Sequence, residues 1–107
     1  MARLIVTAAA SPLFGDFLMV VSVSADADGQ PTTGLKPPNF KIADMASLNH
    51  AVGTPRVITD AVEGPPGFYI VSLKPSPPVL PGHYVFGVAV TAKVGHGQTV
   101  AVGDLPV

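Results

Sequence analysis

The stretch PGHYVFGVAVTAKVGHGQTVAV, from Pro81 to Val102, decides the fold that this sequence predicts. Larger and smaller residues alternate along its first half, so an extended chain would carry bulky apolar side chains on one face and smaller or more polar ones on the other. The bulky face consists of Tyr84, Phe86, Val88, Val90 and Ala92, and the other of Val85, Gly87, Ala89, Thr91 and Lys93. A period of two is typical of a half-buried β-strand.

A second strand is expected to follow after a short turn. Gly95, His96 and Gly97 tolerate the positive φ angles of a tight turn. From Gln98 onward the alternation resumes, with Val100 and Val102 on one side. The pattern predicts a β-hairpin at the centre of the sheet.

The rest of the chain predicts further short strands, separated by Gly and Pro. They are expected at 2–9, 17–25, 39–45, around 56–59 and at 68–73. Pro12 lacks an N–H donor and should end the first strand at Ser11. The four prolines of the segment from Lys74 through Pro81 predict a stiff crossover. Together with the hairpin, these segments predict an all-β sandwich of about seven antiparallel strands.

Composition limits the possible classes of protein. The 107 residues suit a single domain spanning 1–107, and the absence of cysteine excludes disulfides and thiolate metal sites. A net charge of −1 with six basic residues provides no cationic patch for nucleic acid. Twelve Pro and eleven Gly break every apolar run, so membrane insertion is not expected. With only 12% charged residues and a mean hydropathy of +0.47, we expect apolar surface to be buried against a second copy, in a homo-oligomer.

The N-terminal residues allow two interpretations. Residues 1–12 combine one positive charge with a short apolar run, as a vestigial signal segment would, or they form the first strand. We expect the strand, because the run is short and the charge is single. The lack of a convincing signal peptide slightly favours the cytoplasm.

Four stretches give the chain a resemblance to a known family. They are SVSADADGQPTTGL (22–35), NFKI (39–42), GFYIVSL (67–73) and PGHYVFGVAV (81–90). Together they resemble bacterial immunoglobulin-like domains of the macroglobulin and invasin types, from about Phe17 to Val102. Thr32 stands where a Val is usual, and the crossover at 74–81 is longer than usual. The resemblance implies an immunoglobulin-like sandwich, with the Tyr84 hydroxyl bonded to the preceding loop.

Asp26 and Asp28 are the candidate metal ligands. Carboxylates at alternate positions before Gly29 suit Ca²⁺, which prefers hard oxygen ligands. The other interpretation is that Asp28 and Gly29 make a tight turn. Pro37 occupies the twelfth position, where an EF-hand needs Glu. No other cofactor is expected, because the three histidines lack the spacing of a local metal pair.

The sequence does not predict an enzyme. It contains no Gly-x-Ser-x-Gly elbow and no glycine-rich phosphate loop before a helix, and Glu63 is its single Glu. Leu18 and Val20, together with Val85 if their strands are neighbours, are the candidate interface. A loop such as the 74–81 crossover is the alternative cover for this face.

The expected function is a non-catalytic protein-interaction or structural module. It would bind a protein partner or a second copy of itself through the apolar sheet face, with the loops at one end of the sandwich as a secondary site. The alternative is a small-ligand or carbohydrate-binding module, with calcium held by Asp26 and Asp28 as one version of it.

Overall fold

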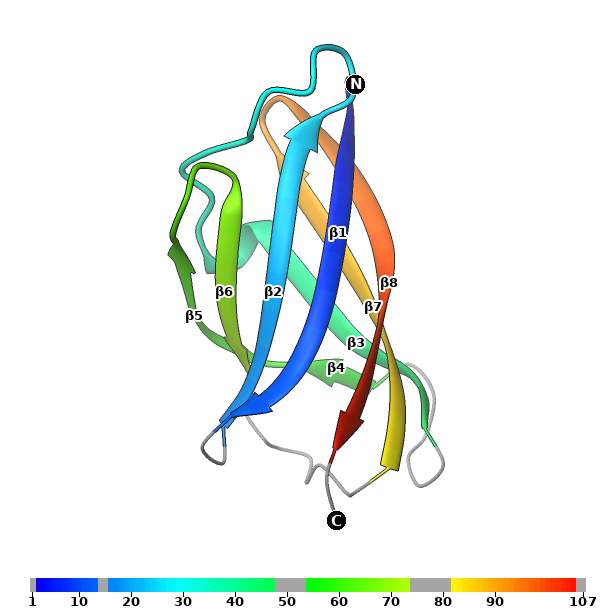
Figure 1. Cartoon of the computed structure of the whole chain (residues 1–107). Helices are drawn as coiled ribbons and strands as arrows, with labels where there is room; N and C mark the ends of the chain where they lie inside the picture. The colour runs from blue at the N-terminus through cyan, green and yellow to red at the C-terminus, as the bar shows by residue number, and fades with distance from the viewer. Residues whose placement is uncertain (1, 14–15, 48–53, 74–81, 106–107) are drawn as a thin grey trace.

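The computed structural model describes residues 2–13, 16–47, 54–73 and 82–105, and these confirm the all-β prediction (Figure 1). The elements are β1 (Ala2–Leu13), β2 (Asp16–Ala25), the 3₁₀ helix η1 (Pro37–Asn39), β3 (Phe40–Ser47), β4 (Thr54–Arg56), β5 (Ile58–Glu63), β6 (Phe68–Leu73), β7 (Gly82–Ala92) and β8 (Gly95–Leu105).

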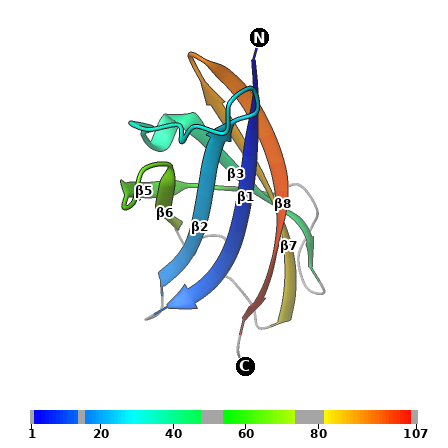
Figure 2. The same ribbon diagram turned by 45° about the horizontal axis from the view of Figure 1, so that its top comes forward.

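The strands make one mixed sheet in the order β4-β3-β7-β8-β1-β2-β6-β5, nearly closed like a barrel. Strands β1, β2, β6 and β5 form a first wall, and β4, β3, β7 and β8 form a second wall that faces it (Figures 1 and 2). Neighbouring strands are antiparallel except β1 and β8, which run parallel where Ala2 pairs with Gly95 and Arg3 with His96. The described residues therefore form eight strands with one parallel pair, not the expected seven antiparallel strands.

The additional strand arises because the predicted strand around 56–59 is two strands. Strand β4 pairs with β3 at one edge of the sheet, whereas β5 pairs with β6 at the other edge. Val57 alone separates them, and its side chain is exposed. The two edges are thus joined by one residue, which explains why the sheet is nearly closed.

The core lies between the two walls and follows the predicted alternation. Phe86, Val88 and Val90 of the central strand β7 are buried, as expected. The buried apolar residues are Leu4, Val6, Met19, Val21, Val23, Leu35, Phe40, Ile42, Tyr69, Val71, Leu73, Phe86, Val88, Val90 and Ala101. Phe40 on the second wall and Tyr69 on the first meet edge to face, with ring centroids 5.3 Å apart, so this aromatic pair connects the walls.

The turn of the central hairpin is two residues earlier than predicted. Ala92 pairs with Gly95, so Lys93 and Val94 make the turn and Gly97 lies within β8. The described glycines with positive φ are Gly29, Gly34 and Gly67. The prediction of a turn at 95–97 was wrong, whereas the turn predicted at Asp28 and Gly29 is confirmed, with a φ of 71° at Gly29.

Gly97 serves a close approach between strands instead of a turn. A Cβ atom built there would overlap the carbonyl oxygen of Leu4 and lie 3.1 Å from Cγ2 of Val6, both on β1. A residue without a side chain is therefore needed where β8 passes β1.

Strand β1 also extends beyond the predicted end at Ser11. Pro12 pairs with Phe17 and Leu13 with Asp16, in the ladder with β2. The described ladder between β1 and β8 includes only Ala2 and Arg3 of β1. Proline is compatible with a strand where its nitrogen faces no ladder partner, which accounts for the longer strand.

Replacing Gly97 with Ala should destabilise the protein. The added methyl group forces β1 and β8 apart, and overpacking of this kind costs about 1–3 kcal/mol. Urea unfolding measures the change in the free energy of unfolding. Gly64→Ala is the matched control, because a Cβ there meets nothing within 4 Å, and it should unfold like the parent or slightly later. Equal midpoints for the two variants would contradict the close approach.

Candidate functional site

Val20 lies in a row of exposed apolar side chains on the outer face of the first wall. Val20 on β2 pairs with Ile70 on β6, and Ile70 pairs with Val62 on β5. Their side chains are 46%, 47% and 54% exposed, respectively. Since neighbouring strands are about 4.8 Å apart, the three side chains form a continuous row roughly 10 Å long.

Two further apolar residues border this row. Phe68, 50% exposed, lies opposite Ser22, and Leu18, partly exposed, lies opposite Ser72. We call the surface made by Leu18, Val20, Val62, Phe68 and Ile70 the apolar face.

A carboxylate lies at the β5 border of the apolar face. Asp60 pairs with Ser72 and is two residues before Val62, so its exposed side chain is on the same side of β5. One of its oxygens accepts a hydrogen bond from the backbone N–H of Ala61 at 2.9 Å. The apolar face is therefore bordered by negative charge.

The structure separates Val85 from Leu18 and Val20. Strand β7 belongs to the second wall, and β8 and β1 lie between β7 and β2 in the sheet. Val85 is partly buried on the outer side of β7, opposite Val102. The three residues predicted as one interface thus lie on two walls, and the cover expected from Lys74–Pro81 concerns residues outside those described.

Sequence reasoning missed Val62, Phe68 and Ile70. The sequence contains a signal for two of them, because alternation along 68–73 places Tyr69, Val71 and Leu73 on one face and leaves Phe68 and Ile70 on the other. Alternation within a strand does not reveal which strand lies beside it, so the pairing of β2 with β6 was needed to join them into one surface.

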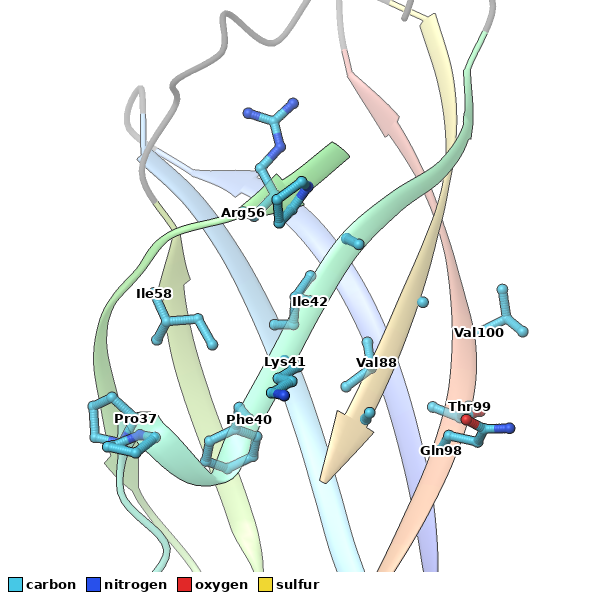
Figure 3. A pocket seen from close by; sticks show the side chains of 15 residues that line it. Pro37, Phe40, Lys41, Ile42, Arg56, Ile58, Val88, Gln98, Thr99 and Val100 are labelled. Carbon is cyan, nitrogen blue, oxygen red and sulfur yellow. The ribbon is translucent and has the colours of Figure 1, made fainter. Parts of the chain in front are cut away.

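The second wall carries a groove of about 1010 Å³ (Figure 3). Its lining includes the small residues Ala43 on β3 and Gly87 and Ala89 on β7, at positions on the outer side of the sheet. Larger residues also line it, namely Phe40, Ile42, Ile58 and Val88. Pro37 of η1 lies on one side, and Gln98, Thr99 and Val100 of β8 lie on the other (Figure 3).

The charged residues that line this groove, among those described, are both cations. Lys41 on β3 is exposed, and Arg56 on β4 is 5% exposed. The groove therefore combines outward-facing small residues with the exposed positive charge of Lys41, whereas a negative charge borders the apolar face.

The Asp26–Asp28 loop forms the predicted turn. Asp28 accepts a hydrogen bond from the backbone N–H of Gln30 at 3.0 Å, and the N–H of Gly29 donates to the carbonyl of Ala25. The Asp28 carboxylate thus stabilises its own turn. The described residues contain no cluster of three or more His, Cys, Asp or Glu suited to a metal. The calcium site stays a prediction. Of the three histidines considered as metal ligands, His50 lies outside the described residues.

Glu63 holds two backbone segments together at the same end of the molecule. One oxygen of its carboxylate accepts a hydrogen bond from the N–H of Gly34, and the other accepts one from the N–H of Gly67, each at 3.0 Å. Gly34 belongs to the connection between the walls, and Gly67 to the turn before β6. The carboxylate therefore ties this connection to the first wall.

The hydroxyl of Tyr69 makes a second tie to the same connection. It donates to the carbonyl of Thr32 at 2.6 Å and accepts from the N–H of Leu35 at 3.2 Å. The bond that the resemblance implied was for Tyr84, whose side chain is outside the description. The bond of Tyr84 stays a prediction, and Tyr69, on the inner face of β6, makes bonds of this kind.

The surroundings of Glu63 and Tyr69 shift the pKa values of the two side chains in opposite directions. The N–H groups of Gly67 and Gly34 stabilise the carboxylate and lower the pKa of Glu63 below its usual value of 4.5. Burial opposes them, and the Tyr69 hydroxyl and the charge of Lys36 add smaller effects that lower it. Burial raises the pKa of Tyr69, and the N–H of Leu35 partly offsets this. At neutral pH, Glu63 is therefore ionised and Tyr69 is protonated, and these are the states in which they make the hydrogen bonds described.

Comparison with known proteins finds no matching family profile, no matching curated protein and no matching solved structure. Among the residues that the structure describes, none belongs to a helix with the length and apolarity needed to cross a bilayer. The function must therefore be inferred from the surfaces themselves.

Tyr69→Phe should lower the free energy of unfolding by about 1–3 kcal/mol, because it removes both hydrogen bonds of a buried hydroxyl. Thermal and urea unfolding measure the loss. Thr59→Val is a suitable control, since its hydroxyl makes an exposed bond to the carbonyl of Ser72 and its removal should cost less. If both variants lose the same free energy of unfolding, the bonds of Tyr69 to Thr32 and Leu35 contribute no more than an exposed hydrogen bond, and the prediction is wrong.

Glu63→Gln should destabilise the protein in a pH-dependent way. The pKa of Glu63 is lowered on folding, so its contribution is present above the unfolded value of 4.5 and is lost as pH falls through the folded pKa. The variant should be less stable than the parent at neutral pH, and the difference should shrink below pH 4.5. Urea unfolding at both pH values measures this. A difference that does not change with pH would contradict the role of the ionised carboxylate.

Proposed function

We propose that this chain is an immunoglobulin-like domain that acts as a non-catalytic interaction module and self-associates through the apolar face. The observation that carries the proposal is the unbroken row of exposed Val20, Ile70 and Val62, with Phe68 beside it. Adjacent large apolar side chains at the surface are typical of sites that bind protein.

The order of the strands supports an immunoglobulin-like fold. In such domains the first, second, fifth and fourth strands form one sheet, and the third, sixth and seventh form the other. If β4 is counted as an additional strand, β5 and β6 are the fourth and fifth strands of such a domain. The first wall, β1-β2-β6-β5, then corresponds to the former sheet. Strands β3, β7 and β8 correspond to the latter, and β4 adds to its edge as the extra strands of variable-type domains do. This correspondence agrees with the family resemblance of residues 17–102.

The edges of the sheet favour association through a face. Strand β4 has three residues and contains Pro55, and β5 carries the charged Asp60. Short edge strands with proline or charge discourage the addition of a further strand. With a net charge of −1, little repulsion opposes the approach of a second copy.

Ile70→Lys should abolish self-association while leaving the fold intact. Ile70 is at the centre of the row and 47% exposed, so the new ammonium group reaches water in the monomer but is buried in the complex. Light scattering behind size exclusion, over a concentration series at two salt concentrations, should show an oligomer for the parent and at least a tenfold weaker association for the variant.

Val94→Lys is the matched control. Val94 is 60% exposed but lies in the turn between β7 and β8, away from the apolar face. It should associate like the parent. A parent that stays monomeric at 10.9 kDa over the whole series would refute the proposed self-association.

A further inference from the structure

We infer that the groove of the second wall receives the apolar face of a second copy, so that copies associate head to tail. The inference rests on the proposed self-association and specifies its geometry. The alternative geometry is a symmetric pair in which two apolar faces meet each other. The two geometries differ in the surface that covers the apolar face, and the shape and charge of the described residues favour the groove.

The first argument is the size of the side chains. The apolar face presents Phe68 and Ile70, about half exposed, above the plane of the sheet. The groove has Ala43, Gly87 and Ala89 at outward positions of β3 and β7, and its volume of about 1010 Å³ is bounded as well by larger residues such as Phe40 and Ile58. Large side chains packed on small ones can interdigitate, as in a protein core, whereas two faces of large side chains must be matched to each other position by position.

The second argument is charge. Asp60 borders the apolar face, and the exposed charged residue among those described around the groove is Lys41, since Arg56 is only 5% exposed. On the first wall, the described cation among the strands is Arg3 on β1, six residues before Ala9, which pairs with Val20. That separation is roughly 20 Å along the strand. In a pair of apolar faces, no described strand residue beside the face offers Asp60 an opposite charge, whereas the groove offers the exposed ammonium group of Lys41.

The geometry has a consequence for the size of the assembly. The face and the groove lie on different walls of the same molecule, so each contact leaves one face and one groove free at the ends. Such heterologous contacts make rings or open chains instead of stopping at a dimer. The mean mass in solution should therefore rise with protein concentration beyond that of two chains.

The test mixes two variants, each of which lacks one surface. Ile70→Lys damages the face and keeps the groove. Ala89→Arg fills the floor of the groove and keeps the face, and because Ala89 points outward from β7, the long side chain does not enter the core. Each variant alone should associate at least tenfold more weakly than the parent. Circular dichroism confirms that both are folded, and Lys41→Asp, at an exposed position, replaces Ala89→Arg if that variant does not fold.

The equimolar mixture decides between the geometries. Head-to-tail packing predicts a complex of one copy of each variant, at twice the 10.9 kDa mass of the chain, that grows no further. If Ala89→Arg associates like the parent and the mixture contains no such complex, the groove takes no part and the inference is wrong, while self-association through the apolar face stands. If the parent itself is monomeric, both the inference and the proposed function fail.

Discussion

The contact between β1 and β8 unites the two walls, and it depends on the absence of a side chain at Gly97. Strand β1 pairs with β2 on the first wall and, through Ala2 and Arg3, with β8 on the second. The carbonyl of Leu4 occupies the place where a Cβ of residue 97 would be. Without this approach, the walls would lose the backbone ladder that joins β1 to β8 and makes them one sheet.

Two further connections act at the same end of the molecule. Glu63 and Tyr69 bind the backbone of residues 32–35, the connection that leaves the first wall after β2 and leads to β3 on the second. The ring of Tyr69 also packs against Phe40 of β3. One side chain thus contributes to the core through its ring and to the connection through its hydroxyl. Backbone groups that the loop cannot pair within itself are satisfied by these two side chains.

The sequence was sufficient where the information is local. Alternation along β7 correctly placed Phe86, Val88 and Val90 inside, because a period of two is a property of the strand itself. It was insufficient where the structure around a residue depends on a partner that is distant in the sequence. Gly97 looked like a turn residue, since the need for close approach to Leu4 is invisible in sequence. The strand expected around 56–59 is two strands, because β4 and β5 have partners on different edges. Pro12 stays in β1 because it pairs with Phe17 of β2, and the residues around Pro12 do not reveal this pairing.

The candidate surfaces show the same division between local and distant information. Leu18 and Val20 were found from their own strand, but Ile70 and Val62 joined them only through pairing, and Val85 proved to belong to the opposite wall.

The outer positions also supply the physical argument for the proposed self-association. Burial of the core requires apolar residues on the inner faces of both walls, but it places no such demand on Ile70, Val62 or Phe68, which are about half exposed. Polar residues there would keep the strand geometry and reduce the contact of apolar surface with water. The second wall has small residues at the corresponding outer positions of β3 and β7. The fold requires neither the large residues on the outer side of one wall nor the small ones on the other. The proposed contact between the two surfaces would account for both, because the large side chains would pack against the small ones.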